Sequence, residues 1–273
     1  AEPLASDHHR RVLGDHGRSA PETWLFNGDD ADLILLLYAE SETHLNTCHK
    51  DLLKDVDVLH AVDSVMLDEG REHFGFPDGL SNPHPGEDTP WGEFVLGYPD
   101  ATGERPPGIA HHGSDIGRDG TYLVIRQLEQ DVVGFWDSLR ARSDDPIALA
   151  QKIIGRSLDG TPLTGSDPIS YEQDAHGMAC PRGAHIRRAN PRDAKPGPEF
   201  PAFSQNRHRL LRRGRPYGPP APPEIYPQNL GVTAQGISPD LNAARGLVFM
   251  SLCANVARQF EFVQQSWLNN PKQ

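Results

Sequence analysis

The sequence predicts an α+β protein with two related halves, and two observations support this fold class. A strand followed by a helix is expected at residues 33–53 and again at residues 120–139. Long segments rich in Pro and Gly follow each unit, and they contain most of the His, Arg and Asp residues that could carry chemistry. Because long loops in a compact protein are usually functional or disordered, the functional residues are expected in these loops.

The first unit begins after a lead-in segment, residues 1–31. The apolar run LILLLY at 33–38 is typical of a buried strand. A helix is expected at about 42–53, because Leu45, Cys48 and Leu52 share one helical face. Residues 60–67, HAVDSVML, are expected to form another strand, and a loop continues to about residue 119.

The second unit begins at Gly120. TYLVIRQ (121–127) is rich in β-branched and aromatic residues and predicts a strand. The apolar residues from 128 to 139 then follow helical spacing and predict a helix, and a short second helix is expected near 147–154. Residues 181–240 are expected to be irregular, before a strand at 246–252 and a helix at about 254–268 with Pro271 beyond it. The apolar positions of the two longer helices are Leu128, Val132, Phe135, Trp136 and Leu139, and then Val256, Phe260, Val263 and Trp267.

Composition limits the possible partners and compartments. The chain has 273 residues, 37% of them hydrophobic, and a net charge of −12, which argues against nucleic acid or an anionic membrane as the main partner. No run is long enough to span a membrane, and the polar N-terminus lacks a signal-peptide core. Three well-separated cysteines without a CxxC motif favour a reducing compartment, so we expect a cytoplasmic protein.

The segment EHFGFPDGLSNP (72–83) places the carboxylate of Asp78 between Pro77 and Gly79, with aromatic residues before it. A turn is the simple explanation, because Pro-Asp-Gly is a common turn sequence. Small residues on either side, including Gly75, would also let the carboxylate lie close to a flat ligand.

Two further segments combine basic and small residues. In CPRGAHIRRANPRD (180–193), His185 follows a Gly-Ala pair and precedes two arginines, one of them Arg187. A neutral imidazole is the commonest axial ligand of haem iron, and nearby arginines could pair with carboxylates of such a group. A loop histidine among solvated arginines is the alternative. In HRLLRRGRPYGPP (208–220), Arg212 could point inward to stabilise negative charge, or belong to a solvated turn.

Together these three segments resemble the dye-decolourising peroxidases, a family of haem peroxidases. GFPDG (75–79) resembles the family's Gly-x-x-Asp-Gly signature, and residues 180–193 resemble the segment with the iron ligand. Residues 210–218 resemble the segment with the distal arginine. Residues 246–271 and LGDHGRSAPETWLFNG (13–28) also resemble family segments. The resemblance implies tandem ferredoxin-like domains, here residues 32–119, with the Gly-x-x-Asp-Gly loop, and residues 120–273, which would bind haem.

Residue by residue, the resemblance implies one haem b per chain, with His185 as its iron ligand. Asp78 would be the distal acid and base, and Arg212 the distal arginine. Leu247 and Phe249 would line the distal pocket, with Gly75, Gly79 and Arg187 also near the cofactor. The implied substrates are hydrogen peroxide and small aromatic or dye-like reductants that give up single electrons.

Some assignments stay open. Glu261 or Asp174 could accept the second N–H of the His185 imidazole, and His73 could be either a second distal polar group or buried filler. His208 is expected to be a solvent-exposed loop residue.

No strand–helix pair is visible before residue 32, so the first ferredoxin-like domain is expected to be incomplete. An apolar sheet face and edge would then be exposed, which favours a homo-oligomer. A non-catalytic haem-binding protein, or an inactive truncated remnant, is the alternative to an enzyme. The chain lacks a G-x-S-x-G motif, and no expected strand leads into a G-x-G-x-x-G helix, which argues against a serine hydrolase or a dinucleotide enzyme.

Overall fold

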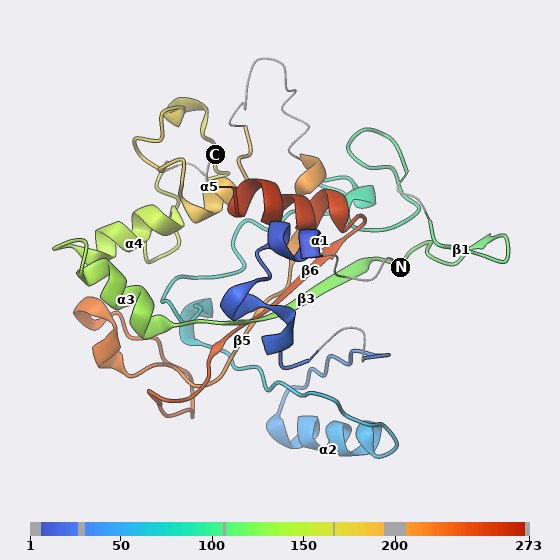
Figure 1. The fold of residues 1–273 in the computed structure, drawn as a ribbon, viewed down its shortest axis with the longest axis horizontal. Coiled ribbons are helices and arrows are strands. Elements are labelled where there is room, and N and C mark those ends of the chain that lie inside the picture. Colours follow the sequence, from blue (N-terminus) through green and yellow to red (C-terminus); the bar gives the residue numbers. More distant parts are fainter. Residues whose placement is uncertain (1–6, 27–30, 106–107, 166, 194–205, 271–273) are drawn as a thin grey trace. The chain divides into compact units, whose positions relative to one another are not determined.

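The computed structural model describes residues 7–26, 31–105, 108–165, 167–193 and 206–270 (Figure 1). Along the chain these fall into two compact units, one ending at Asp63 and one beginning at Ser64. The predicted division of the second unit between residues 119 and 120 stays a prediction. No helix among the described residues is both long and apolar enough to cross a lipid bilayer.

The first unit is small and mostly exposed. It contains α1 (Asp7–Leu13), α2 (Glu42–Leu53) and the short turns η1 (Gly17–Ser19) and η2 (Pro21–Thr23). The predicted helix at 42–53 is confirmed, and the Ser41 hydroxyl caps it by accepting a hydrogen bond from the His44 N–H at 3.2 Å.

The predicted buried strand at 33–38 is wrong. This segment is extended and pairs with no strand among the described residues, and most of its apolar side chains are exposed, from 44% for Leu36 to 72% for Leu33, while Leu37 is half-buried. The physical reason is that a strand is stable only beside a partner that accepts and donates its backbone hydrogen bonds. The described part of the first unit contains no such partner.

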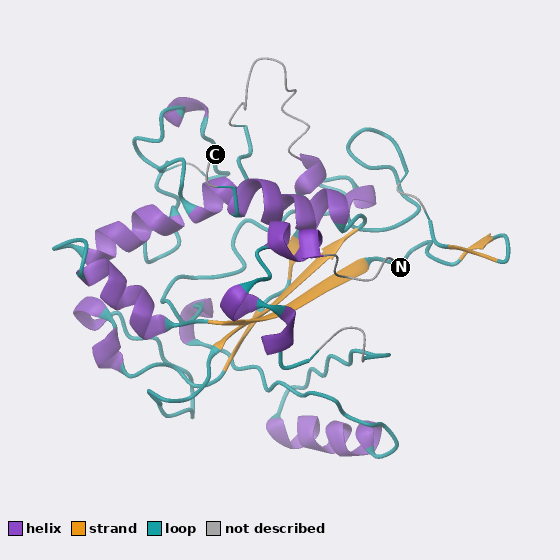
Figure 2. Cartoon of the chain, in the orientation of Figure 1, coloured by secondary structure: helices purple, strands orange, loops and turns teal. Residues whose placement is uncertain are grey.

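A sheet of four strands forms the centre of the second unit (Figure 2). β3 (Tyr122–Glu129) and β6 (Gly246–Cys253) pair antiparallel over their whole length, from Tyr122 opposite Cys253 to Glu129 opposite Gly246. The short strands β4 (Leu211–Arg212) and β5 (Arg215–Tyr217) pair with the other edge of β6. The strands predicted at 121–127 and 246–252 are therefore confirmed. A separate hairpin joins β1 (Ala110–His111) and β2 (Ser114–Asp115).

Two helices follow β3 and carry most of the apolar core. α3 (Val132–Arg140) begins after Asp131, whose side chain accepts a hydrogen bond from the Gly134 N–H, so the helix starts later than the apolar spacing from Leu128 predicts. α4 (Pro146–Ile154) confirms the short helix expected near 147–154 and ends at Gly155, which has a left-handed backbone. The core joins these helices to the irregular segments around them and includes Leu67, Phe76, Val132, Trp136, Leu139, Ala150, Tyr226 and Val232.

The C-terminal helix is present but unusually wide. Its segments η10 (Ala257–Glu261) and η11 (Val263–Leu268) include hydrogen bonds that span five residues, such as Glu261 N–H to Val256 O at 3.0 Å. Phe260, Val263 and Trp267 are buried, as the spacing predicts, and Pro271 lies outside the described residues. The Phe260 ring lies 5.9 Å from the ring of Phe249, so this helix covers one face of the sheet (Figure 1).

The remaining described segments are mostly irregular, as predicted for residues 181–240, of which 194–205 lie outside the described residues. The strand predicted at 60–67 is wrong, because this segment makes only one isolated bridge, Ser64 opposite Tyr217. A short helix, α5 (His185–Ala189), interrupts the irregular region. The other short turns are η4 (Asp68–Gly70), η5 (Trp91–Glu93), η6 (Glu172–Asp174), η8 (Pro223–Ile225) and η9 (Pro227–Asn229).

Candidate active site

Asp78 lies at the end of a tight turn in the second unit. Its backbone N–H donates to Gly70 O at 2.9 Å, and Arg71 forms a bridge with Pro77. Gly75 has a φ of +106°, and a Cβ there would meet a Leu230 methyl at 2.9 Å. Gly79 also has a positive φ, but a Cβ there would meet open space. These glycines therefore shape the turn through their backbone, and Gly75 faces Leu230 at close range.

Arg212 reaches this turn from β4. Its Nη1 lies 3.5 Å from Asp78 Oδ1, and its Nη2 donates to Leu80 O at 2.7 Å. The Arg212 backbone N–H also donates to the Asn82 side chain at 3.1 Å, which holds β4 against the turn. The two charged side chains are 30% and 36% exposed, so the pair is open to a small molecule.

The sheet register places the predicted pocket residues on the same face as Arg212. Residues directly opposite each other in an antiparallel pair point to one face, and Arg212 lies opposite Ser251. Leu247, Phe249 and Ser251 follow one another at every second position of β6, so their side chains share this face. A Cβ at Gly214 would lie 3.4 Å from both Asp78 Oδ2 and a Leu247 methyl, so Gly214 lies beside both residues. Sequence reasoning missed Gly214, although it lies within the LLRRGRPYG segment.

His185 begins α5 and faces the same charged pair. Its side chain is exposed, yet surrounding protein lowers the pKa of the imidazole, with Arg212 lowering it further and Asp78 opposing. The ring is therefore accessible to a ligand, although neighbouring protein atoms desolvate it. The lowered pKa favours the neutral imidazole, which is the form that ligates metals. The structure thus brings Asp78, Arg212 and His185 within electrostatic reach of one another.

The two arginines after His185 anchor α5 to other segments of the protein and do not contact Asp78 or Arg212. Arg188 Nε donates to Trp267 O at 2.8 Å, which fixes α5 to the C-terminal helix. Arg187 is buried, forms an ion pair with Asp174 at 3.0 Å, and lies 4.4 Å from the centre of the Tyr171 ring. Since these contacts occupy the Arg187 guanidinium, the geometry favours a structural role over the predicted cofactor contact.

The contacts of Asp174 bear on the predicted partner of His185. Besides Arg187, its carboxylate accepts hydrogen bonds from the Ala179 and Cys180 N–H groups, at 3.1 and 2.9 Å. Within the described residues no hydrogen bond joins Asp174 to the His185 imidazole. These contacts hold the loop before His185, and Glu261 stays as the alternative acceptor.

His73 lies beneath the Asp78 turn and is fully buried. Its Nε2 shares a hydrogen bond with Tyr217 O at 2.9 Å, and burial lowers its pKa to about 4, so the ring is neutral near pH 7. This burial supports a packing role over a second distal group.

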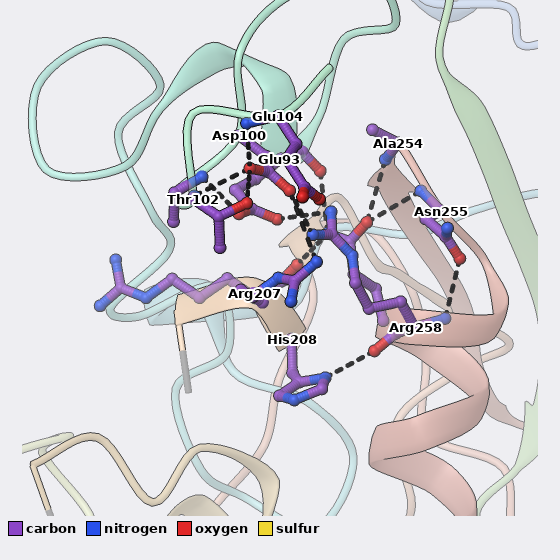
Figure 3. A network of polar contacts seen from close by, with 12 residues as sticks. Glu93, Asp100, Thr102, Glu104, Arg207, His208, Ala254, Asn255 and Arg258 are labelled. Atoms are coloured by element: carbon purple, nitrogen blue, oxygen red, sulfur yellow. Dashed lines mark hydrogen bonds and ion pairs between the residues drawn. The ribbon is translucent and has the colours of Figure 1, made fainter. Parts of the chain in front are cut away.

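A charged network joins the segment of Glu93 and Asp100 to the C-terminal helix (Figure 3). Arg258 on η10 pairs with Glu93 at 2.9 Å and with Asp100 at 2.7 Å. Burial raises the pKa of Glu93, while for Asp100 burial is outweighed by hydrogen bonds from Thr102 and Arg258, and its pKa is lowered. Sequence reasoning missed this network, because its partners are about 160 positions apart in the chain.

The segment before β4 joins the same network. The Gln259 side chain donates to Arg209 O at 2.7 Å and to Glu93 O at 2.8 Å. The predicted exposed position of His208 is wrong: its ring stacks on Phe262 at 3.9 Å and its Nδ1 bonds with Arg258 O at 2.6 Å, as Figure 3 shows for the latter. The apolar face of the C-terminal helix creates this site, which the loop sequence alone does not reveal.

Comparison with known proteins assigns the chain to a family. The family described as "Dyp-type peroxidase, C-terminal" matches residues 69–273. The multifunctional dye peroxidase DyP2 of Amycolatopsis sp. is 35% identical over 240 residues, which cover 74% of this chain and 47% of the relative. A dye-decolorizing peroxidase of Mycena epipterygia is 32% identical over 308 residues, covering 92% of this chain and 54% of the relative.

Solved structures agree with the sequence relatives. The structure of the Amycolatopsis DyP2 has a TM-score of 0.63 at 27% identity, over 83% of this chain and 54% of the other. A DyP-type peroxidase of Anabaena sp. has a TM-score of 0.68 at 23% identity. The aligned residues make up 98% of this chain and 60% of the Anabaena chain, which shows the shared fold. The predicted α+β, ferredoxin-like fold class is thereby confirmed, and this chain spans about half the length of the curated relatives it matches. The chain belongs to the DyP-type peroxidase family.

Proposed function

We propose that this chain is a haem-dependent peroxidase that reduces hydrogen peroxide and oxidises phenolic or dye-like donors by one-electron steps. The observation that carries the proposal is the position of Asp78 and Arg212, 3.5 Å apart, within electrostatic reach of His185. The relatives support the substrate class, since several are named for dyes and one dye-decolorizing peroxidase of similar fold was solved with 2,6-dimethoxyphenol.

The side chains of the candidate site fit a haem. His185 offers an exposed imidazole whose lowered pKa favours the metal-binding neutral form. Arg192 Nε is buried and has no hydrogen-bond partner among the described residues, so Arg192 is a better candidate than Arg187 to pair with a haem carboxylate. Leu247 and Phe249 supply apolar surface on the face that Arg212 shares.

When bound, the haem would supply an iron that coordinates peroxide and stores the oxidising equivalents. Asp78 Oδ1 faces Arg212, and Oδ2 makes no hydrogen bond among the described residues. We assign Oδ2 the proton transfer: it would take the proton from one oxygen of the peroxide and return it to the other oxygen, which leaves as water. The Arg212 guanidinium would stabilise the negative charge that develops on the leaving oxygen.

We also propose Glu261 as the acceptor for the second N–H of His185, because Asp174 is occupied by Arg187 and two backbone amides. Such an acceptor raises the basicity of a ligating imidazole. Glu261→Gln is then expected to shift the haem reduction potential, whereas Asp174→Asn acts on the stability of the loop before α5. An unchanged potential in Glu261→Gln contradicts this assignment.

At the domain level, we propose that residues 120–273 form the haem-binding ferredoxin-like domain, and that residues 32–119 belong to a partial first domain with the Asp78 loop. Both Asp78 and His185 lie in the compact unit that begins at Ser64. This unit would therefore contain the whole proposed site.

The test is an absorption spectrum of the protein reconstituted with haem, before and after one equivalent of hydrogen peroxide. The wild type is compared with His185→Ala and with His111→Ala, whose side chain is exposed on the β1–β2 hairpin. We expect a Soret band that is lost only in His185→Ala and that shifts with peroxide. A Soret band that peroxide does not change would support the non-catalytic haem-binding alternative, and no uptake by the wild type would support the inactive remnant.

A further inference from the structure

The carboxylate of Glu72 lies inside the turn that carries Asp78. Its Oε2 accepts the Phe74 N–H at 2.8 Å, and its Oε1 accepts the Phe76 N–H at 2.9 Å. The Gln130 amide donates a third hydrogen bond to Oε2 at 2.5 Å. The Glu72 side chain thus binds the amides of Phe74 and Phe76 and connects them to Gln130, which lies 58 positions away in the chain.

The backbone of the turn closes around this carboxylate. The Glu72 N–H donates to Phe76 O, and the Gly75 N–H donates to Glu72 O, both at 2.9 Å. On the outer side, Arg71 Nη1 donates to Gly75 O at 2.5 Å and to Leu158 O at 2.8 Å. The position of residues 72–76 is therefore determined by side chains of the residues that begin the turn.

The same contacts determine where Asp78 lies. Its backbone N–H is tied to Gly70 O at 2.9 Å, two residues after the last amide that Glu72 holds. Among the described residues, the one hydrogen bond of the Asp78 side chain is the long contact to Arg212, at 3.5 Å. Because this contact is weak, the carboxylate depends on the backbone for its position.

Gln130 connects the turn to the sheet. It follows β3 directly, and its backbone N–H donates to Arg245 O at 3.0 Å, next to the first residue of β6. β6 carries Leu247 and Phe249, and it pairs with β4, which carries Arg212. Through Gln130, the Glu72 carboxylate links the turn of Asp78 to the sheet of Arg212.

Withdrawing part of this carboxylate from water costs free energy, which its hydrogen bonds must offset. Desolvation raises the pKa of Glu72, while the two amides and Gln130 lower it and the charge of Asp78 raises it. Three hydrogen bonds to one half-buried carboxylate are stronger than the bonds that a neutral side chain would accept, so Glu72 holds the turn more firmly than a neutral residue would.

We propose that Glu72 is a positioning residue for the peroxide reaction, whose carboxylate holds the turn of residues 72–76 so that Asp78 stays beside Arg212. This inference rests on the proposed function of Asp78. Glu72 acts through the backbone and touches neither peroxide nor haem.

The test is a double-mutant cycle of Glu72→Gln and Asp78→Asn in the haem-reconstituted protein, with Glu129→Gln as control. Glu129 is exposed at the end of β3, beside Gln130. The first measurement is hydrogen exchange at the Phe74 and Phe76 amides. The second is the rate of the spectral change after mixing with hydrogen peroxide.

We expect Glu72→Gln to speed exchange at both amides and to slow the peroxide reaction about 10- to 100-fold while the Soret band stays unchanged. In the Asp78→Asn background, Glu72→Gln should slow the reaction no further, because its effect passes through Asp78. Glu129→Gln should change neither quantity. An equal further loss in both backgrounds would show a general structural effect and overturn the proposal, as would an unchanged rate in Glu72→Gln alone.

A second variant covers the case in which Glu72→Gln does not fold. Gln130→Leu keeps a side chain of similar size but removes one hydrogen-bond donor to Glu72. It should give the same pattern with a smaller loss of the peroxide reaction rate, about severalfold. Failure of the proposed function is visible separately, as a wild type without a Soret band or an Asp78→Asn variant with the wild-type rate. Unchanged exchange at Phe74 and Phe76 in Glu72→Gln instead disproves the role of Glu72 by itself.

Discussion

At the scale of single residues, three histidines share one electrostatic property. Surrounding protein lowers the pKa of His73, His185 and His208, so each favours the neutral ring near pH 7. Their surroundings differ: His73 is fully buried, His208 is half-buried against Phe262, and the side chain of His185 is exposed. Only the last combines a neutral ring with access for a ligand.

The pKa of His73 predicts a pH dependence of stability. The unfolded chain protonates this residue below about pH 6.5, but the folded protein does so only below about pH 4. Between these values the unfolded state binds more protons, so the stability present above pH 6.5 is lost as the pH falls toward 4. The His73 contribution to this loss is about 3 kcal/mol at most.

Urea denaturation at pH 7, 5.5 and 4.5 tests this prediction. His73→Gln should lose less stability than the wild type over this range, whereas His112→Gln, an exposed residue, should lose as much as the wild type. The same loss in His73→Gln and the wild type would show that His73 does not cause the effect.

At the scale of elements, the C-terminal helix holds the site together. It packs on the sheet through Phe260, binds α5 through Arg188, and holds Glu93 and Asp100 through Arg258. The helix therefore positions both the histidine and the strand of Arg212, although it supplies neither residue.

Replacing Arg258 is expected to be costly for this reason. Arg258→Met leaves the buried carboxylate of Glu93 without its cation and should lower the free energy of unfolding by about 3–5 kcal/mol. Asp137→Asn, which removes an exposed ion pair with Arg140 on α3, should cost less than about 1 kcal/mol. Urea denaturation compares the two variants, and losses of equal size would mean that the Glu93 network does not stabilise the fold.

At the scale of the whole molecule, the exposed run at 33–38 predicts self-association. The neighbouring side chains of Leu33, Ile34, Leu35 and Leu36 are all exposed, and such an apolar run is an aggregation hazard. We expect the wild type to sediment as a concentration-dependent mixture of species, and a variant with Ile34→Lys and Leu36→Lys to sediment as a monomer. A wild type that sediments as a clean monomer at all concentrations contradicts the predicted homo-oligomer.

The sequence by itself determined the features that depend on neighbouring residues. The strands at β3 and β6, the helices α2, α3 and α4, and the three motifs with Asp78, Arg212 and His185 could all be predicted, because periodicity and local motifs are properties of short segments. The tertiary structure decided which of these segments meet. It paired Arg187 with Asp174, stacked His208 on Phe262, joined Arg258 to Glu93, and left the side chains of residues 33–36 exposed. Such pairings join residues distant in the chain and depend on burial, which only the folded chain defines.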